Sequence, residues 1–388
     1  MTRPTVEVAD IVHAQGDRFI DQHQSWLSYQ HLKVLRAIRR CRTAELGGHV
    51  DVCSRCGYKA ISYNSCRNRH CPKCQAQARQ RWIEKREQEL LHVGYFHVVF
   101  TLPHELNALC FQNPALLYDL LFKTSAATLL EIAADPKHLG AQIGFLSILH
   151  TWGQNLLLHP HVHCVIPAGG LSPDQTKWVH PRYVFFLPVK VLGRVFRGKF
   201  IDGLRRAFQS RNLRLDASLQ DPRRFADFLH TLFRQDWVVY AKPAFGDPTR
   251  VLRYLGRYTH RVAISNHRLL NFDGERVTFR WKDYAHGDKQ RKMTLTGTEF
   301  LRRFVQHILP QDFVRIRHFG FLANRCRAKL VTLGRRLLAM TPPEPASAAS
   351  ATPAQSSWSC PHCSATMQIG EKLTAWQLAL RCSFFDTS

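Results

Sequence analysis

Hydrophobic and polar positions alternate along this chain with two different periods. Apolar residues recur near helical spacing over 18–40, which predicts one or two opening helices, and the charged stretch 76–91 also has a helical pattern. The segment 95–102 instead alternates with a period of two and stops at Pro103, as a strand does. The chain is therefore expected to begin with helices and to turn to strands near residue 95.

The pattern of the following residues predicts a large α+β region. Strands are expected at 142–150, 155–167 and 237–242, and helices at 114–135, most of 190–234, 298–308 and 320–339. Short antiparallel strands are expected at 268–272, 277–282 and 291–295, and Asp273-Gly274 is a good hairpin turn between the first two. Asp247 and Pro248 predict the N-cap and first position of a further helix that runs through Tyr258.

Composition changes divide the chain into four parts. Little apolar material and many Cys, Gly and Arg residues occupy 47–75, so this segment cannot be held together by burial alone. After Met340 the sequence becomes rich in Pro, Ala and Ser, which is typical of a linker. We expect a helical and metal-binding N-terminal domain at 1–94, a main domain at 95–340, a linker at 341–359 and a Cys-containing tail at 360–388.

The charge of the chain points to a polyanionic partner. The 54 Lys and Arg residues exceed the 29 Asp and Glu residues, which gives +25 at neutral pH. Each cation that neutralises a phosphate releases condensed counterions, so nucleic acid is favoured over anionic lipid. No apolar run approaches the roughly 18 residues of a membrane span, and the N-terminus has no secretory pattern. We therefore expect a soluble cytoplasmic protein without a membrane partner.

Cysteine spacing predicts a structural zinc site. Cys53 and Cys56 form one CxxC pair, Cys71 and Cys74 form a second, and 14 residues separate the pairs. Two such pairs commonly fold a small module around tetrahedral zinc, and four thiolates leave no open position for catalysis. The alternative is a set of unliganded buried cysteines. Cys66 is an alternate ligand, with His49 and His70 as further candidates.

Basic residues surround these cysteines, so the same module is a candidate DNA-binding surface. Arg67 and Arg69 are the two residues that we expect to contact DNA there. The tail carries a third pair, Cys360 and Cys363, with Cys382 as another thiol but no second CxxC. The tail therefore resembles half of a zinc ribbon, and the sequence leaves open whether it binds metal.

A histidine-rich segment predicts a second kind of metal site. In the string LHPHVHCVI, a strand would place His159, His161 and His163 on one face, and Val162 and Cys164 on the other. Three imidazoles on one face are well placed to share a cation, whereas the alternative is a partly exposed polar strand.

A tyrosine pair lies in the predicted helix that begins near Asp247. Tyr254 and Tyr258 are four residues apart and so share one helix face. The adjoining positions carry arginines without an intervening carboxylate, namely Arg250, Arg253, Arg257 and Arg261. These cations would ease deprotonation of a tyrosine and would hold a phosphodiester beside it, although the pair could also serve core packing.

Together these two elements suggest a reaction. A divalent ion at the histidine face would polarise a phosphate oxygen, and a tyrosine would attack phosphorus to give a covalent phosphotyrosine. The chain has no GxxxxGK[ST] phosphate loop, which agrees with a reaction that needs no nucleotide hydrolysis.

The motifs also resemble a known family. His161-Val162-His163 with the downstream Tyr-x3-Tyr is similar to the two-tyrosine HUH nucleases. The strings SCRNRHCPKCQ, LHTWGQNLLLHPHVHCVIPAGG, RYLGRYTHRVAISNHRL and GFLANRCRAKL resemble the rolling-circle transposases of the insertion-sequence-91 family, which carry an N-terminal zinc-binding domain. These strings span about residues 47–339, which is most of the chain.

The resemblance implies a fold and an activity. It implies a central antiparallel sheet flanked by helices, with Mg²⁺ or Mn²⁺ and structural Zn²⁺ as cofactors. The implied enzyme is a metal-dependent tyrosine DNA endonuclease and strand transferase that acts on single-stranded DNA at element ends and on target DNA. His161 and His163 would bind the ion, and Tyr254 and Tyr258 would be the nucleophiles.

Several alternatives remain open at this point. The third protein ligand is not identified by the resemblance, and Gln154 is our choice, followed by His159 and His260. Two imidazoles and an amide would suit zinc or manganese better than magnesium. A non-enzymatic zinc-dependent DNA-binding protein would also account for the charge and the cysteines. A replication initiator or relaxase would use the same chemistry.

Overall fold

The computed structural model describes most of the chain. The described residues are 4–87, 89–181, 187–245, 256, 263–283, 287–340 and 358–385. Apart from Gly256, the helix predicted to begin at Asp247 lies outside them, together with its two tyrosines. No helix of the described residues is long and apolar enough to cross a bilayer.

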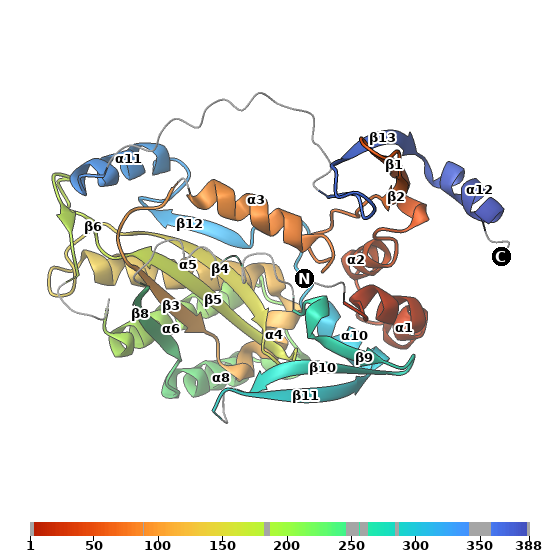
Figure 1. The fold of residues 1–388 in the computed structure, drawn as a ribbon. Helices are drawn as coiled ribbons and strands as arrows, with labels where there is room; N and C mark the ends of the chain where they lie inside the picture. The colour runs from red at the N-terminus through yellow and green to blue at the C-terminus, as the bar shows by residue number, and fades with distance from the viewer. Residues whose placement is uncertain are drawn as a thin grey trace.

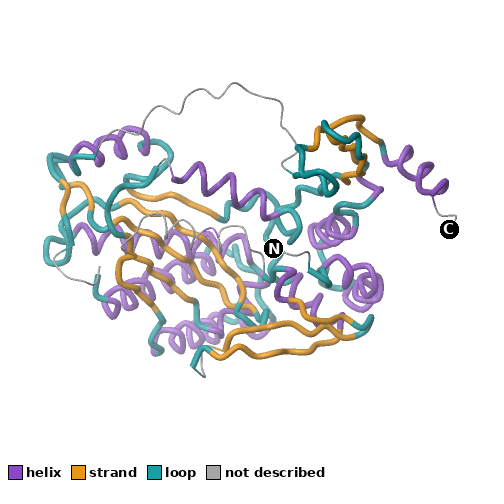
Figure 2. The backbone as a smooth tube through the Cα atoms, viewed as in Figure 1, coloured by secondary structure: helices purple, strands orange, loops and turns teal. Residues whose placement is uncertain are grey.

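A five-stranded antiparallel sheet forms the centre of the molecule (Figures 1 and 2). Its strand order is β12 (Ile316–Gly320), β4 (Gly144–Trp152), β5 (Leu158–Pro167), β3 (Tyr95–Thr101) and β8 (Val239–Phe245). All four pairings in this sheet are antiparallel. The expected α+β fold with a central antiparallel sheet is therefore confirmed.

One face of the sheet packs on a layer of helices. Because strand residues alternate, Val162, Cys164 and Ile166 all point to this face, where each is fully buried. The opposing apolar side chains come mainly from α5 (Pro114–Ala134), α6 (Val189–Gln209) and α8 (Pro222–Arg234). Proline at the first helical turn of α5 and of α8 favours these starts, since the missing N–H would have no partner there.

The other face of the sheet is apolar at one end and carries histidines at the other. Trp82 and Ile83 of α3 (Gln75–Glu87) pack against Leu146, Ile148 and Val165 at the apolar end. Helix α3 lies beside β12 on this side of the sheet (Figure 1). This arrangement connects the Cys-rich segment directly to the central sheet.

A second core lies beyond the turn between β4 and β5. It joins α1 (Val8–His23), α2 (Tyr29–Arg39) and α10 (Gly297–Val305) to a three-stranded sheet of order β11-β10-β9. The strands of this sheet are β9 (Leu269–Phe272), β10 (Arg276–Asp283) and β11 (Lys289–Thr296). Asp273 accepts two backbone N–H groups and Gly274 has φ +99°, so the predicted turn between β9 and β10 is confirmed.

A third, small sheet joins the two ends of the chain. Strand β1 (Gly48–Cys53) pairs on one side with β2 (Lys59–Tyr63) and on the other with β13 (Met367–Leu373), after which α12 (Ala375–Phe385) follows. The remaining described elements are short, namely η1 (Ala44–Leu46), η2 (His104–Leu106), α4 (Asn107–Gln112), β6 (Gly170–Leu171), β7 (Trp178–Val179), α7 (Ala217–Gln220) and η3 (Asn266–Arg268).

The helix predicted at 320–339 is wrong at its beginning. Strand β12 ends at Gly320, a turn follows, and α11 covers only Arg327–Leu337. Gly320 has φ +59°, and a Cβ atom there would lie 1.8 Å from the carbonyl oxygen of Ile143. The backbone therefore turns sharply against β4 where a helix was expected. Strand β12 was missed because its five residues are all half-buried and show no alternation.

Candidate metal centres and nucleic-acid interface

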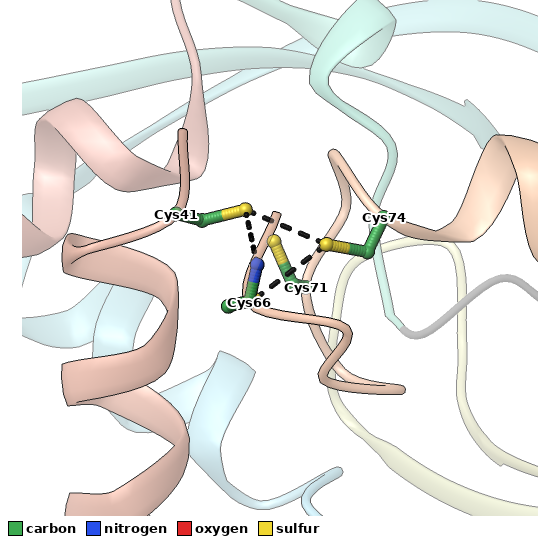
Figure 3. Close-up of side chains that lie close together, drawn as sticks. All are labelled: Cys41, Cys66, Cys71 and Cys74. Carbon is green, nitrogen blue, oxygen red and sulfur yellow. Dashed lines mark hydrogen bonds between the residues drawn. The ribbon is translucent and has the colours of Figure 1, made fainter. Parts of the chain in front are cut away.

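The first candidate metal centre is a cluster of four cysteines (Figure 3). Cys41 follows the end of α2, Cys66 lies in the loop after β2, and Cys71 and Cys74 immediately precede α3. The Sγ atom of Cys74 lies 3.4 Å from that of Cys41 and 3.5 Å from that of Cys66. Figure 3 shows the side chains converging from three segments of the chain.

The spacing of these thiols suits a metal ion and excludes disulfides. The separations far exceed the sulfur–sulfur bond of about 2.05 Å, and all four cysteines are free. Tetrahedral zinc with Zn–S bonds of about 2.3 Å requires sulfurs about 3.8 Å apart, close to what is observed. Cys41 and Cys71 are fully buried, so the site is closed to solvent on that side. The donor set therefore fits structural zinc.

The predicted zinc site is wrong in its grouping. Cys53 and Cys56 do not join Cys71 and Cys74, because the β1–β2 hairpin carries them to another cluster, with Cys360 and Cys363. The expectation used sequence proximity, whereas the hairpin separates the two CxxC pairs. Cys66, the alternate ligand, does belong with Cys71 and Cys74.

Sequence reasoning missed Cys41 altogether. It has no CxxC partner, and only the packing of the end of α2 against the loop after β2 brings it to the site. The two spare histidines lie elsewhere. His49 contacts Asp51, and the Nε2 atom of buried His70 accepts the N–H of Leu309 at 3.1 Å. His70 thus connects the cysteine loop to the segment that follows α10 and is absent from the metal-like clusters of the described residues.

Arg67 and Arg69 differ in their surroundings. Arg67 is exposed and has φ +51° at the tip of the cysteine loop. The Arg69 guanidinium instead donates to the carbonyl oxygens of Phe313 at 2.6 Å and Pro310 at 2.7 Å. Partial burial lowers the Arg69 pKa from its ordinary value. Its cation is committed to protein carbonyls, so Arg69 braces the loop although the residue is exposed, as Arg67 is.

The second candidate centre is a group of three histidines on the central sheet. His161 and His163 share one face of β5, and His150 of β4 lies directly opposite His161 in the antiparallel register. Their ligand atoms lie within 4.8 Å of one another. The ring centroids of His150 and His163 are 4.3 Å apart, and those of His161 and His163 are 4.8 Å apart. The predicted division of β5 into a histidine face and an apolar face is confirmed.

Hydrogen bonds fix the imidazoles of this group. Nδ1 of His161 lies 2.6 Å from the carbonyl oxygen of His159, which can only accept, so the proton is on Nδ1 and the lone pair on Nε2. Nδ1 of His163 lies 2.7 Å from Nε2 of buried His97 on β3. Such partners of the remote ring nitrogen hold a histidine in orientation for a cation.

Burial keeps the imidazoles of His161 and His163 neutral. Desolvation, with a smaller effect of His159, lowers the pKa of His161 to about 3, and desolvation lowers the pKa of His163 well below its usual value. A histidine ligand must be unprotonated, so these side chains need not release protons when a cation binds near neutral pH. Three imidazoles from two adjacent strands, two of them kept neutral by burial, therefore fit a divalent ion.

The third histidine of this group, His150, was not among the ligand candidates named from the sequence, of which Gln154 came first. Gln154 lies in the turn after β4, where its backbone carbonyl accepts the guanidinium of Arg268. His159 is exposed near the beginning of β5, with its ring centroid 5.1 Å from that of His161. The third earlier candidate, His260, lies outside the described residues. His150 could have been found by folding 142–150 and 155–167 into a hairpin, which sets it opposite His161.

The tyrosine helix cannot be placed beside this centre, because Tyr254 and Tyr258 lie outside the described residues. The same holds for Arg250, Arg253, Arg257 and Arg261. The described residues on either side of the tyrosine segment show where the chain leaves the central sheet and where it is next described. Strand β8 ends at Phe245 opposite Tyr95, and Ala263 resumes the chain within the second core.

Two family models match the chain. One is described as a transposase zinc-binding domain and matches residues 11–102, and the other is described as a putative transposase and matches residues 144–329. A putative transposase from Sinorhizobium fredii is 53% identical over 348 residues, which cover 89% of this chain and 87% of the relative. The chain belongs to the IS91-type transposase family. The resemblance read from its motifs is thereby confirmed.

A second relative supports the same family. The transposase for insertion sequence element IS801 from Pseudomonas savastanoi pv. phaseolicola is 31% identical over 320 residues, covering 79% of this chain and 73% of the relative. No solved structure matches the chain. The matched zinc-binding segment includes Cys41, Cys66, Cys71 and Cys74, and the matched transposase segment contains all three histidines of the second centre. Structural zinc and action on DNA follow from family membership and these clusters.

Proposed function

We propose that this transposase cleaves and rejoins single-stranded DNA at the ends of its insertion sequence through a covalent phosphotyrosine. The observation that carries the proposal is the convergence of His150, His161 and His163 on one face of the sheet, where burial keeps His161 and His163 neutral. These residues would hold a divalent ion, and a bound ion would supply positive charge to a non-bridging phosphate oxygen. The resemblance implies Mg²⁺ or Mn²⁺, and three imidazoles favour Mn²⁺ of the two.

The nucleophile in this proposal is a tyrosine. The oxygen of Tyr254 or Tyr258 forms a bond to phosphorus while the bond from phosphorus to a deoxyribose oxygen breaks, and that oxygen leaves with a proton. Attack by a hydroxyl of a second strand reverses the step and releases the tyrosine. Two tyrosines allow one strand to be held while another is cut. In the chain, the tyrosine segment lies between the edge strand β8 and Ala263 of the second core. The same core includes Leu156, which belongs to the turn between the two histidine-bearing strands β4 and β5.

A basic surface near the first cysteine cluster supports DNA binding at the N-terminal domain. Lys33, Arg36 and Arg40 of α2 and its C-cap line one hollow with Cys66 and with Tyr29, which is 73% exposed. Cations attract the phosphate backbone, and an exposed ring can stack on an unpaired base. We propose that this hollow and Arg67 contact DNA beside the zinc site, while the four arginines around the tyrosines hold the strand to be cut.

The experiment is metal-dependent nicking of a labelled single strand that carries an element end. We expect His161→Ala with His163→Ala to abolish nicking in Mn²⁺ while DNA binding and thermal unfolding stay close to those of the parent. His318→Ala, on the same sheet face but outside the histidine cluster, is the matched control and should nick normally. Nicking by the double variant at the rate of the parent would contradict the proposal. It would show that nicking does not depend on a cation held by these histidines.

A further inference from the structure

The second cysteine cluster lies between parts of the chain that are far apart in sequence. Cys53 and Cys56 belong to the turn between β1 and β2, whereas Cys360 and Cys363 precede β13. The Sγ atom of Cys53 lies 3.4 Å from that of Cys363, and the Sγ atom of Cys56 lies 3.6 Å from those of Cys360 and Cys363. All four cysteines are free, and these separations approach the roughly 3.8 Å of tetrahedral zinc.

The two CxxC turns have the same local structure. The N–H of Cys53 donates to the carbonyl of Tyr58, and the N–H of Gly57 donates to the carbonyl of Cys53. The second turn repeats this pattern at the same offsets, with Cys360 donating to Ala365 and Ser364 donating to Cys360.

Two further features repeat between the turns. A backbone N–H two residues after the first cysteine donates to its sulfur, from Arg55 at 3.4 Å in one turn and from His362 at 3.4 Å in the other. The fourth residue after the first cysteine has positive φ in both, with Gly57 at +72° and Ser364 at +60°. Two like turns therefore face each other, each aiming two sulfurs and supporting N–H groups at a common centre.

Strand pairing also joins the tail to the N-terminal hairpin. Strand β13 pairs with β1 in antiparallel register, which sets Met367 opposite Cys53 and Leu373 opposite Gly48. Trp358 Nε1 donates to the carboxylate of buried Asp51 at 3.1 Å, and the hydroxyl of Ser54 donates to Thr366. The tail thus completes a three-stranded ribbon whose other two strands come from the N-terminal domain.

This ribbon has too little apolar core to hold itself together. Its cluster has only three buried members among the described residues, Cys53, Cys360 and Met367, and two of these are candidate ligands. Small modules of this kind need a metal or disulfides to be stable. No disulfide is present among the described cysteines, so a metal is the remaining crosslink.

We infer that Cys53, Cys56, Cys360 and Cys363 bind a second structural zinc ion, which clamps the C-terminal tail onto the N-terminal zinc-binding domain. The matched zinc-binding segment ends at residue 102 and so contains only half of this ligand set. Four thiolates close the coordination sphere, so the ion has a structural role. The inference does not depend on the tyrosine chemistry proposed above.

The test is the zinc content of the purified full chain after dialysis against a weak chelator. Cys360→Ser with Cys363→Ser should lower it by one ion per chain, and Cys53→Ser with Cys56→Ser should lower it by the same amount. All four substitutions together should remove no more than either pair, because both pairs share one ion. Zinc content unchanged by the tail pair, or a twofold larger loss in the quadruple variant, would overturn the inference.

Two controls separate this result from a general loss of structure. Cys326→Ser changes a free, half-buried cysteine outside both four-cysteine clusters and should leave zinc content unchanged. The second control is reconstitution with Co²⁺, followed by the sulfur-to-cobalt charge-transfer absorption. Only thiolate sites give this absorption, so the histidine centre does not contribute. The tail-pair variant should keep about half of this absorption, from the first cluster. Full absorption in that variant would contradict a shared site.

A second measurement uses the wild-type chain, so its result does not depend on the stability of any variant. Elastase is used to cut the wild-type chain within its Ala-rich segment, between residues 341 and 357. The released piece that carries Cys360 and Cys363 should still co-elute with the rest of the protein, and excess chelator should separate them. Separation without chelator in the zinc-loaded protein would refute the clamp.

Discussion

Arg69 and Arg67 offer a sharp test, because both are exposed on one loop and Arg69 is held there by hydrogen bonds to backbone carbonyls. Arg69 donates two charge-assisted hydrogen bonds to carbonyl oxygens of Phe313 and Pro310, one part-buried and one exposed. Each bond of this kind contributes about 1.5 to 3 kcal/mol when it is shielded from water. The exposed bond is screened by water, so we count its contribution at about half. Arg69→Gln should then lower the free energy of unfolding by roughly 2 to 4 kcal/mol.

Arg67→Gln is the matched variant and should have the opposite profile. Its side chain is exposed, so the free energy of unfolding should stay within about 0.5 kcal/mol of that of the parent. If Arg67 neutralises one phosphate of a single strand, the slope of log affinity against log salt should fall by about 0.7 in magnitude. Arg69→Gln should leave that slope unchanged wherever the protein is folded.

The assays are denaturant unfolding and fluorescence anisotropy with a labelled single strand at several salt concentrations. Equal stability of Arg69→Gln and the parent, together with a reduced salt slope in that variant, would refute the assignment of Arg69 to a bracing position. It would restore Arg69 as a DNA contact. An unchanged slope in Arg67→Gln would remove Arg67 from the proposed DNA surface.

Three further predictions concern the sheet and its surroundings. His150→Ala should reduce Mn²⁺-dependent nicking about 100-fold and Gln154→Ala less than 10-fold, and the reverse order in a metal titration would make Gln154 the third ligand. Burial lowers the pKa of His307 to about 4, so its unfolded form takes up a proton first as pH falls below about 6.5. The parent should therefore lose about 2 kcal/mol more unfolding free energy than His307→Gln between pH 7.5 and 5, and equal losses in denaturant titrations would show that His307 does not titrate in this way. Gly320→Ala should lower the melting temperature by several degrees, because the new Cβ would meet the Ile143 carbonyl at φ +59°, and a parental melting temperature would contradict that backbone conformation.

Local pattern was sufficient for much of the fold and for the histidine face. Segments such as 95–102 and 155–167 alternate with a period of two because one face is buried against helices, so both strands were predicted. The same alternation separated His161 and His163 from Val162. Residues that are half-buried throughout, as in β12, leave no such signal.

Contacts between distant segments could not be predicted from one sequence. Cys41 joins Cys66 only through the packing of α2, and Cys53 joins the tail only because β13 pairs with β1 across more than 300 residues. Two CxxC pairs close together in sequence favoured a single site. The β1–β2 hairpin rules it out, because its turn carries Cys53 and Cys56 to the tail. His150 was overlooked for a related reason, since its place beside His161 depends on the register of two strands.

The most direct test of the proposed chemistry is to identify the residue that carries DNA after reaction with an element end in Mn²⁺. Trypsin separates the two tyrosines, because Arg253, Arg257 and Arg261 bound the peptides YLGR and YTHR. After nuclease digestion, mass spectrometry should find a nucleotide on Tyr254 or Tyr258, and none when both are phenylalanine. A nucleotide on any other residue, or nicking without a protein adduct, would contradict the account.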